Sequence, residues 1–418
     1  MQLTPLAAGC FALGACPYWV YCPAPLALAS LASDALEKAS QRTIAGVERY
    51  DVVVVGVGGM GSAALYHLAR RGKRALGLER FDLLHEHGSS HGLSRIIRLA
   101  YFEHPDYVPL VRRAYELWRE LEAEAGEQLL HVTGIVEGGA HVLEGVLRAC
   151  AVHDLEHESL SGAEVARRFP AYRLPEEMEV VYQRDGGFVV PERCIVAHVN
   201  GALARGAVVR ARERVLEWAE TEHGVRIRTD RGAVAAERVV FTAGAWSQDV
   251  ARLRSGTVEA VRQALAWFQP ARPELFLPER MPVFNLVLDG EHFYGFPAFG
   301  IPGVKLGFYD TAAESGDPDT ISRVPTLADE VPLRAFAERY LPDGAGPTLA
   351  LKTCLYEPSP DGHFVIDAHP ESEHAVVAAG FSFHGFKFSS VVGEILADLA
   401  LDGSTSHDIE LFRLDRFA

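Results

Sequence analysis

Two arginines stand close together in residues 88–98, a block that also contains serine and histidine. The guanidinium groups of Arg95 and Arg98 could clamp a carboxylate, because each presents several N–H donors in one plane. They could equally offset negative charge on a cofactor, or form ordinary salt bridges in a loop. The spacing of the two residues does not decide among these interpretations, so the block is a candidate anion site.

A second block, residues 380–390, places Lys387 among several phenylalanines directly before a predicted helix at 389–401. A loop that leads into a helix N-terminus attracts negative charge, and a lysine adds a full positive charge there. That negative charge could belong to a substrate carboxylate or to a reduced ring system. The alternative is a capped helix with an exposed lysine, but the aromatic residues favour burial.

A single cysteine, Cys354, lies in a segment whose composition predicts a strand, residues 351–356. Side chains alternate between the two faces of a strand, so Lys352, Cys354 and Tyr356 would share one face. The ammonium group of Lys352 could then favour the thiolate form of the cysteine. On the residues alone, a buried and unreactive thiol is the favoured interpretation.

One pattern suggests a metal site, but its surroundings argue against it. His153 and His157 frame an H-x-x-E-H sequence, which binds zinc when a continuous helix brings both imidazoles together. Residues 161–164 look like a capping box that begins a new helix, so we expect His157 in the connection before it. The sequence therefore predicts no metal site. It also contains no phosphate-binding P-loop.

These residues need a scaffold, and its clearest part begins at residue 50. Residues 50–55 form an almost unbroken β-branched run, as expected of a strand buried on both faces of a parallel sheet. Gly56, Gly58 and Gly61 follow it and satisfy G-x-G-x-x-G, and residues 62–71 predict a helix. Strand, glycine turn and helix in this order predict a dinucleotide-binding motif.

An acidic residue, Glu79, follows a second predicted strand at 74–78. Its carboxylate could accept hydrogen bonds from the hydroxyls of an adenosine ribose, while the helix N-terminus holds the pyrophosphate. The alternative is a glycine-rich turn that only packs a helix against a strand. The motif does not separate NAD from FAD, because both contain the same ADP half.

Further predicted elements continue the alternation of strand and helix. They are an amphipathic helix at 106–124 and strands at 208–215, 225–229, 238–242 and 376–379. The 418 residues give room for two or three domains of ordinary size. Neither a fixed-period repeat nor a low-complexity linker separates them, so we expect the domains to be interleaved along the chain.

Charge is distributed unevenly along the chain. The net charge of -16 argues against nucleic acid or an anionic membrane as a main partner. No charged residue occurs from Met1 to Ser33, a run long enough to span a bilayer. Prolines interrupt this run, however, and it lacks the positive n-region of a signal peptide. We expect residues 1–48 to be a poorly ordered extension or the product of a start codon assigned too far upstream, with membrane association or export as the alternative.

Cysteine usage indicates the compartment. The six cysteines form neither a CxxC motif nor a paired framework, which is typical of a reducing environment. We therefore expect a cytoplasmic protein with no membrane partner.

Together, the two anion blocks and the Cys354 segment resemble, in the same order, the monomeric sarcosine oxidase family, which includes N-methyltryptophan oxidase. That family belongs to the D-amino-acid-oxidase-like flavoproteins, and the resemblance runs from about Tyr50 to the C-terminus. It implies an α/β fold in which a Rossmann-like FAD-binding domain is interleaved with an α+β substrate domain built on a mixed sheet. The FAD-binding domain would comprise residues 49–129, 191–257 and 353–418, and the substrate domain residues 130–190 and 258–352.

The resemblance also implies roles for individual residues. FAD would be bound covalently through Cys354, which replaces the interpretation of an unreactive thiol. Arg98 and Lys387 would hold the substrate carboxylate, and Lys305 would activate oxygen on the other face of the flavin. Further matched residues are Arg95 and His91 near the flavin, Tyr294 and Tyr356 in the substrate pocket, and Gly56, Gly58, Gly61, Glu79, Ser90, Gly385 and Lys387 around the cofactor.

Three residues depart from the family's pattern. Tyr309 stands where sarcosine oxidase has a histidine, Phe383 stands where glycine is usual, and Ser90 replaces a usual histidine. Phe383 adds bulk beside the expected substrate pocket. A larger N-methyl amino acid, or a cyclic imino acid, is therefore an alternative to sarcosine.

The resemblance implies a monomeric oxidase of secondary amines that carry a carboxylate, with molecular oxygen as the second substrate. Oxidative demethylation of an N-methyl amino acid would yield an aldehyde, an amino acid and hydrogen peroxide. A pipecolate or proline oxidase is the alternative enzyme. A non-catalytic flavin-binding protein tethered to a membrane is the alternative from another class, but mere binding would not need the oxygen-side Lys305.

Overall fold

The computed structural model describes residues 43–44, 47–309 and 313–417. Contacts group Val47–Ala418 into one compact unit, and the fold below is that of this unit. A two-residue strand, β1 (Thr43–Ile44), precedes it. The expected extension, residues 1–48, lies almost wholly outside the described residues. Within the described part of the chain, no helix is long and apolar enough to cross a membrane.

The first sheet is built around β2, the strand that precedes the glycine turn. β2 pairs in parallel with β3 on one side and with β13 on the other, and β21 also pairs in parallel with β13. The strands of this sheet lie in the order β10 (Val208–Arg210), β3 (Ala75–Leu78), β2 (Val47–Val55), β13 (Gly232–Phe241), β12 (Gly224–Thr229) and β11 (Val215–Thr221). In addition, β21 (Ala375–Ala379) pairs with β13, and β20 (Val365–Ala368) pairs with β21.

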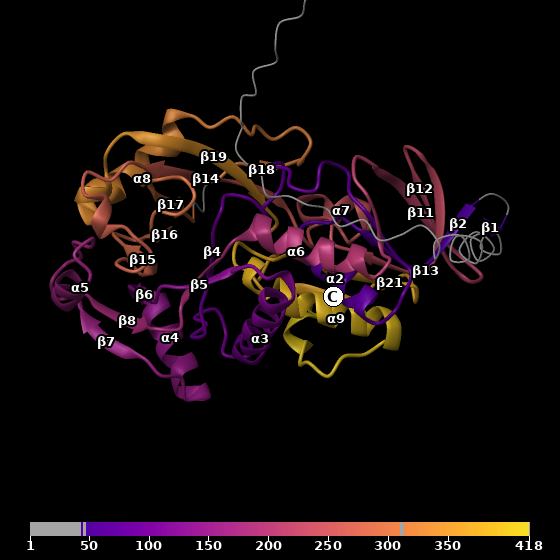
Figure 1. The fold of residues 1–418 in the computed structure, drawn as a ribbon, viewed down its shortest axis with the longest axis horizontal. Coiled ribbons are helices and arrows are strands. Elements are labelled where there is room, and N and C mark those ends of the chain that lie inside the picture. Colours follow the sequence, from indigo (N-terminus) through magenta and orange to yellow (C-terminus); the bar gives the residue numbers. More distant parts are fainter. Residues whose placement is uncertain (1–42, 45–46, 310–312, 418) are drawn as a thin grey trace, which may run out of the picture. The chain divides into compact units, whose positions relative to one another are not determined.

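Alternate valines of β2 pack into two different hydrophobic cores. Val52 and Val54 pack in the core that the helices supply, whereas Val53 and Val55 pack on the opposite face with residues of β11 to β13. The β-branched run is therefore buried on both faces, as predicted. The helices beside this sheet in Figure 1 are α2 (Gly59–Arg70), α3 (Tyr107–Ala125), α6 (Pro191–Ala204) and α9 (Ser389–Asp402).

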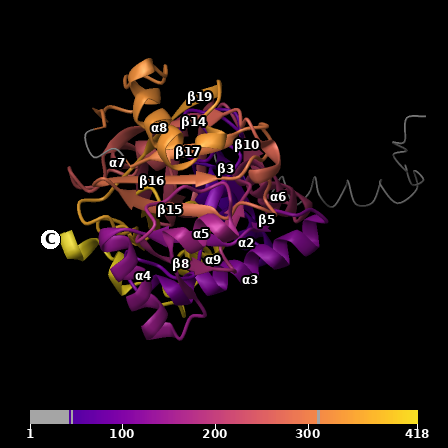
Figure 2. The ribbon, with the colours of Figure 1, turned by 90° about the vertical axis from the view of Figure 1, so that its left-hand side faces the viewer.

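The second sheet is mixed and lies beside a different set of helices (Figures 1 and 2). Its strands lie in the order β18 (Ser315–Gly316), β14 (Ala260–Phe268), β17 (Val304–Phe308), β16 (Glu291–Phe296), β15 (Val283–Leu288), β6 (Ile135–Gly138), β8 (Glu179–Gln183) and β7 (Glu158–Ser161). In addition, β19 (Thr348–Tyr356) pairs with β14. Helix α8 (Leu327–Tyr340) covers it, because Phe336 stacks on Phe284 and Phe293 of β15 and β16.

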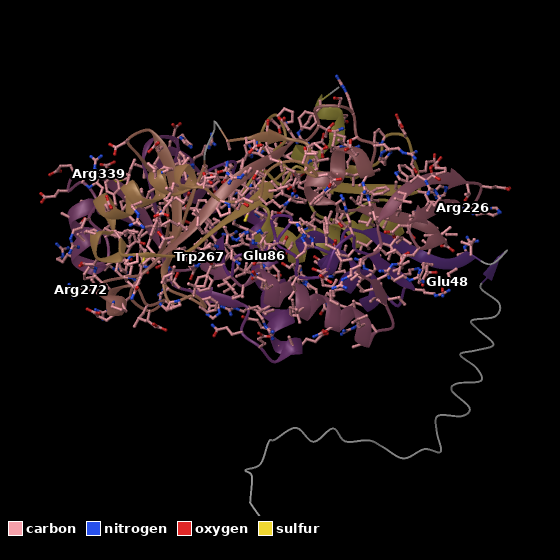
Figure 3. The ribbon with its side chains drawn as sticks, turned by 90° about the horizontal axis from the view of Figure 1, so that it is seen from above. Glu48, Glu86, Arg226, Trp267, Arg272 and Arg339 are labelled. Atoms are coloured by element: carbon pink, nitrogen blue, oxygen red, sulfur yellow. The ribbon has the colours of Figure 1, made fainter. Side chains whose placement is uncertain are left out.

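A small third sheet, β4 (Arg95–Ile97), β9 (Gly187–Val189) and β5 (Leu130–Val132), carries the first anion block. The remaining helices are α4 (Ala140–His153), α5 (Gly162–Arg168), α7 (Ser247–Val250) and the 3₁₀ turns at Gly244–Trp246, Pro273–Leu275, Pro342–Gly344, Phe386–Phe388, Glu410–Phe412 and Leu414–Phe417. Figure 3 shows Trp267 of β14 in the interior, while Arg226, Arg272 and Arg339 extend from the surface.

The α/β fold is confirmed, with differences in detail. Helix α2 begins at Gly59, three residues before the predicted start, because its first turn uses the glycines themselves. The predicted strand at 208–215 is wrong as one element: it is β10 followed by the start of β11, with a break between them. The two larger sheets draw on interleaved segments, but β19 runs on to Tyr356, past the predicted boundary at residue 352. We retain two interleaved domains as a proposal.

Candidate functional site

The three glycines of the turn have different spatial roles. Gly56 has φ +91°, and a Cβ there would lie 2.5 Å from the carbonyl oxygen of Thr242. A Cβ on Gly61 would lie only 1.8 Å from the oxygen of Gly56, so α2 packs on the turn only if residue 61 is glycine. A Cβ on Gly58 would meet nothing closer than Ser90 Oγ at 3.7 Å. The first and third glycines therefore close the turn, and the second leaves space beside it.

A cavity of about 320 Å³ begins at this turn. Glu79 and Thr242, which follow β3 and β13, line it together with Gly58, so it opens at the carboxyl ends of three parallel strands. That edge is where open α/β sheets bind dinucleotides. Of the predicted cofactor residues, Gly56, Gly58, Glu79, Ser90 and Gly385 line the cavity.

The carboxylate of Glu79 is positioned by backbone donors. Its Oε2 accepts a hydrogen bond from Val57 N at 2.9 Å, and its Oε1 accepts one from Phe81 N at 2.9 Å. Burial raises the pKa of Glu79 despite these bonds. The glycine turn and this acid at the cavity wall fit the ADP half of FAD.

A second cavity of about 30 Å³ adjoins the first. Arg95, Tyr356, Phe383 and Phe386 line both cavities. The smaller cavity is also lined by Ile96, Arg98, Asn285, Tyr294, Phe296, Tyr309, His384 and Lys387. The structure thus brings all the predicted substrate residues to one place, although they come from distant parts of the chain.

Four aromatic rings form one wall of this smaller cavity. The ring of Tyr309 lies 5.0 Å from that of Tyr294 and 5.7 Å from that of Phe383, and Phe383 lies 5.0 Å from Tyr356. The hydroxyl groups of Tyr294 and Tyr356 are 3.4 Å apart. Phe383 has φ +69°, a left-handed conformation that is costly for a bulky residue. Such strain is typical of functional sites.

Two of the pocket's cations, Arg98 and Lys387, are buried and already have partners. Nη2 of Arg98 donates to both carboxylate oxygens of Glu103, at 2.8 and 2.6 Å. Nε of Arg98 forms an ion pair with Glu137 Oε1 at 2.8 Å. Lys387 Nζ donates to the carbonyl oxygen of His384 at 2.6 Å, and burial lowers the pKa of Lys387 well below its ordinary value.

Cys354 lies in a buried cluster next to the pocket. Its Sγ is 3.3 Å from Nε2 of His91 and 3.8 Å from Nη2 of Arg95. Burial raises the pKa of Cys354, and Arg95 and Lys305 oppose that shift. The effect of Lys352 on the thiolate stays a prediction, and Lys352 itself is partly exposed and pairs with Glu86.

The ammonium group of Lys305 is fully enclosed by the chain. Its Nζ donates to the carbonyl oxygens of Gly92 and Ser94 at 2.7 and 2.8 Å, and to Ser94 Oγ at 3.2 Å. It also lies 4.5 Å from the ring centroid of Phe296. Burial lowers the pKa of Lys305 well below its ordinary value. Among the described residues, the lining of the two cavities includes neither Lys305, His91 nor Cys354.

Sequence reasoning missed the two acids that pair with Arg98, Glu103 and Glu137. Glu103 follows Arg98 by five residues, a spacing that carries no recognisable motif. Glu137 is a lone acid in the apolar strand β6, and that isolation is the only signal that indicated a special role. Asn285 lies beside Glu137 in the strand register, which no local pattern reveals.

The candidate zinc pattern does not form a site. Ser161 and Glu164 make the predicted capping box, and His157 lies in the connection between α4 and β7. Nowhere in the described part of the chain do three or more His, Cys, Asp or Glu side chains gather as metal ligands would.

Comparisons with known proteins identify the family of this chain. The model of the DAO family of FAD dependent oxidoreductases matches residues 51–399. Monomeric sarcosine oxidase of Bacillus sp. (strain NS-129) is 39% identical over 88% of this chain and 97% of that enzyme. N-methyl-L-tryptophan oxidase of Salmonella arizonae is 34% identical over 88% of this chain and all of that enzyme. The structure of NikD, an unusual amino acid oxidase essential for nikkomycin biosynthesis, superposes with a TM-score of 0.78 at 29% identity, over 88% of this chain and 98% of that one. The chain therefore belongs to the DAO family of FAD-dependent oxidoreductases.

Proposed function

We propose that this protein oxidises the N-methyl group of an N-methyl amino acid and passes the electrons to oxygen. The products are an aldehyde, the demethylated amino acid and hydrogen peroxide. The observation that carries the proposal is the convergence of Arg98 and Lys387 on an aromatic pocket that shares Arg95, Tyr356 and Phe383 with the cofactor cavity. Relatives named sarcosine oxidase and N-methyltryptophan oxidase support this substrate class.

The carboxylate of the substrate binds between Arg98 and Lys387. Both side chains are buried, so their attraction for an anion is screened little by water. The cavity of about 30 Å³ holds roughly one water molecule, so the lining side chains must shift to admit an amino acid. Fixing one end of a small substrate in this way orients its nitrogen and methyl group.

The amine end lies against the wall of Tyr294, Tyr309, Tyr356 and Phe383. These rings exclude water and favour the uncharged amine, which has the lone pair that oxidation requires. FAD supplies the two-electron acceptor for the reaction. The imine formed from the substrate is then hydrolysed by water, which releases the aldehyde and the amino acid.

We further propose that FAD is attached covalently through Cys354. The thiol lies between His91 and Arg95, and Arg95 also lines the cofactor cavity. Acid precipitation tests the linkage: yellow flavin should remain with the pellet, and flavin in the supernatant would contradict it. A Cys354→Ala variant should release its flavin.

Lys305 is assigned to oxygen activation. A buried, fixed cation stabilises the negative charge that develops as oxygen is reduced. Its three contacts with Gly92 and Ser94 hold the ammonium group in place at no cost in reorganisation. We also propose that the enzyme works as a cytoplasmic monomer, which sedimentation and cell fractionation test directly.

Peroxide production with a panel of amines tests the function. We expect activity with sarcosine or N-methyltryptophan and less with pipecolate and proline. A preference for the two cyclic imino acids would replace the proposed substrate class with the alternative one. Absence of peroxide with every secondary amine would contradict the oxidase assignment.

A further inference from the structure

Arg98 binds two carboxylates that differ in their access to water. The side chain of Glu103 is 15% exposed, whereas that of Glu137 is 0% exposed. Glu103 belongs to the segment between β4 and α3, and Glu137 is fixed in the interior of the second sheet. A ligand carboxylate can therefore displace Glu103 toward solvent, but it cannot displace Glu137.

The surroundings of Glu137 hold it beside Arg98. Asn285 on the neighbouring strand β15 donates from Nδ2 to Glu137 Oε1 at 3.2 Å, and His292 Nε2 lies 2.6 Å from Asn285 Oδ1. Oε2 of Glu137 is buried and has no hydrogen-bond partner within the described residues. A buried carboxylate with an unpartnered oxygen is costly, so an apolar residue would stabilise this strand better. The stability of the sheet therefore does not explain why residue 137 is an acid.

The charge balance of the pocket does explain it. Arg98 and Lys387 are the cations that act on Glu137, and Glu103 is the other acid. Arg95, the third cation of the pocket, has Glu192 as an acid that acts on it. When a ligand displaces Glu103, Arg98 and Lys387 face one permanent carboxylate, and this pair of cations keeps a single net positive charge for the ligand.

We propose that Glu137 is a specificity-determining residue that restricts the pocket to ligands with one carboxylate group. It does so by permanently balancing one of the two cations, Arg98 and Lys387, that hold the ligand carboxylate. This inference rests on the proposed function only in placing the ligand carboxylate at Arg98 and Lys387. An N-methyl amino acid with an uncharged side chain satisfies the restriction, and an N-methyl dicarboxylic acid does not.

The charge of Glu137 changes in an accessible pH range. Burial raises the pKa of Glu137 to about 7, although Arg98 and Asn285 oppose the shift. Glu137 is therefore charged above pH 7 and neutral below it. The titratable or charged groups that interact with it are Arg98, Glu103, Lys387, Cys150, Tyr115 and Tyr309. All of these remain in a Glu137→Gln variant, so their own titration cancels in the ratio of wild-type to variant affinity.

Calorimetric titration of the FAD-loaded enzyme tests the proposal with two ligands that cannot be demethylated, acetate and malonate. At pH 8.5, Glu137→Gln should bind acetate about tenfold more tightly than the wild type, and malonate about thirtyfold more tightly, which is the limit set by protonation of Glu137 in the wild type. At pH 6 the two proteins should differ by no more than about twofold, because Glu137 is then protonated. If Glu137 had only a structural role, its replacement would instead weaken the binding of both ligands.

Two further variants serve as controls. Glu103→Gln should tighten acetate binding equally at both pH values, because Arg98 lowers the pKa of Glu103 and keeps it charged. Asn285→Asp adds a negative charge at the pocket wall and should weaken acetate binding about tenfold at pH 8.5, which tests the charge argument even if Glu137→Gln folds poorly.

The outcomes separate the inference from the proposed function. If the wild type binds acetate and Glu137→Gln gains nothing at pH 8.5, the role of Glu137 is overturned while the carboxylate site stands. If no form binds acetate at any pH, the carboxylate site at Arg98 and Lys387 is overturned, and the role of Glu137 with it.

Discussion

The cofactor cavity and the substrate pocket are built in different ways. The cofactor cavity depends on backbone: Gly56, Gly58 and Gly61 shape it, and backbone donors hold Glu79. The substrate pocket depends on side chains from the second and third sheets and from the segment before α9, with Arg95, Arg98 and Lys387 as its cations. The glycine turn of the first is local in the sequence and tolerates no added atoms at Gly56 and Gly61, whereas the second is assembled from distant side chains that can be replaced one at a time.

The largest effect is expected from an added methyl group in the glycine turn. Gly61→Ala places a Cβ 1.8 Å from the oxygen of Gly56, so α2 must separate from β2. We expect loss of FAD binding and a free energy of unfolding lower by about 3 kcal/mol or more. Flavin absorbance and thermal unfolding measure both effects.

Gly72→Ala is the matched control. Gly72 has φ +71°, but nothing lies within 4 Å of the added Cβ. We expect a cost of only about 1 kcal/mol and normal FAD content. If Gly61→Ala also kept its FAD, the distinction between a backbone-built cavity and a side-chain-built pocket would fail.

Removal of a pocket cation should affect catalysis but not cofactor binding. Lys387→Met should lower kcat/KM by about a thousandfold, because the substrate carboxylate loses a buried charge-assisted contact. The FAD content should stay normal, since Lys387 lines the smaller cavity rather than the cofactor cavity. Steady-state kinetics and flavin absorbance measure the two quantities, and a variant without flavin would show that the two regions are not separable.

Replacement of Lys305 should change one half-reaction, the reaction with oxygen, and leave the reduction by substrate almost unchanged. Lys305→Met should slow the reaction of the reduced enzyme with oxygen by about a hundredfold, because the fixed cation is lost. Anaerobic reduction by substrate should be almost unchanged. Stopped-flow measurements of each half-reaction test this, and unchanged oxygen reactivity would count against the role of Lys305.

The smallest effect is expected at the aromatic wall. Phe383→Gly removes a strained aromatic residue and enlarges the space between Tyr309 and Tyr356. The ratio of kcat/KM for N-methyltryptophan to that for sarcosine should rise about tenfold, since a few buried methylene groups are worth this much in a pocket. Tyr309→Phe keeps its ring and should leave the ratio within about twofold. Equal ratios in all three proteins would show that the wall does not select the substrate.

Prediction from sequence succeeded where a signal is carried by neighbouring residues. The strand, glycine turn and acid of the cofactor motif were predicted, and so were α9 and the capping box at Ser161. Each depends on backbone conformations and side-chain types a few residues apart. The break between β10 and β11 was missed because residues 211–214 contain no Gly, Pro, Asn or Asp, the residues that mark turns.

The sequence by itself determined the family and the FAD motif, because short motifs record local backbone requirements, and it predicted substrate residues from the family's blocks. Only the tertiary structure decided that Glu137 and Glu103 share Arg98, and that Lys305 is enclosed by Gly92 and Ser94. The register between β6 and β15 places Glu137 beside Asn285, and an ion pair joins it to Arg98, which directly follows β4. Contacts of this kind join residues far apart in the chain, so no local pattern can encode them.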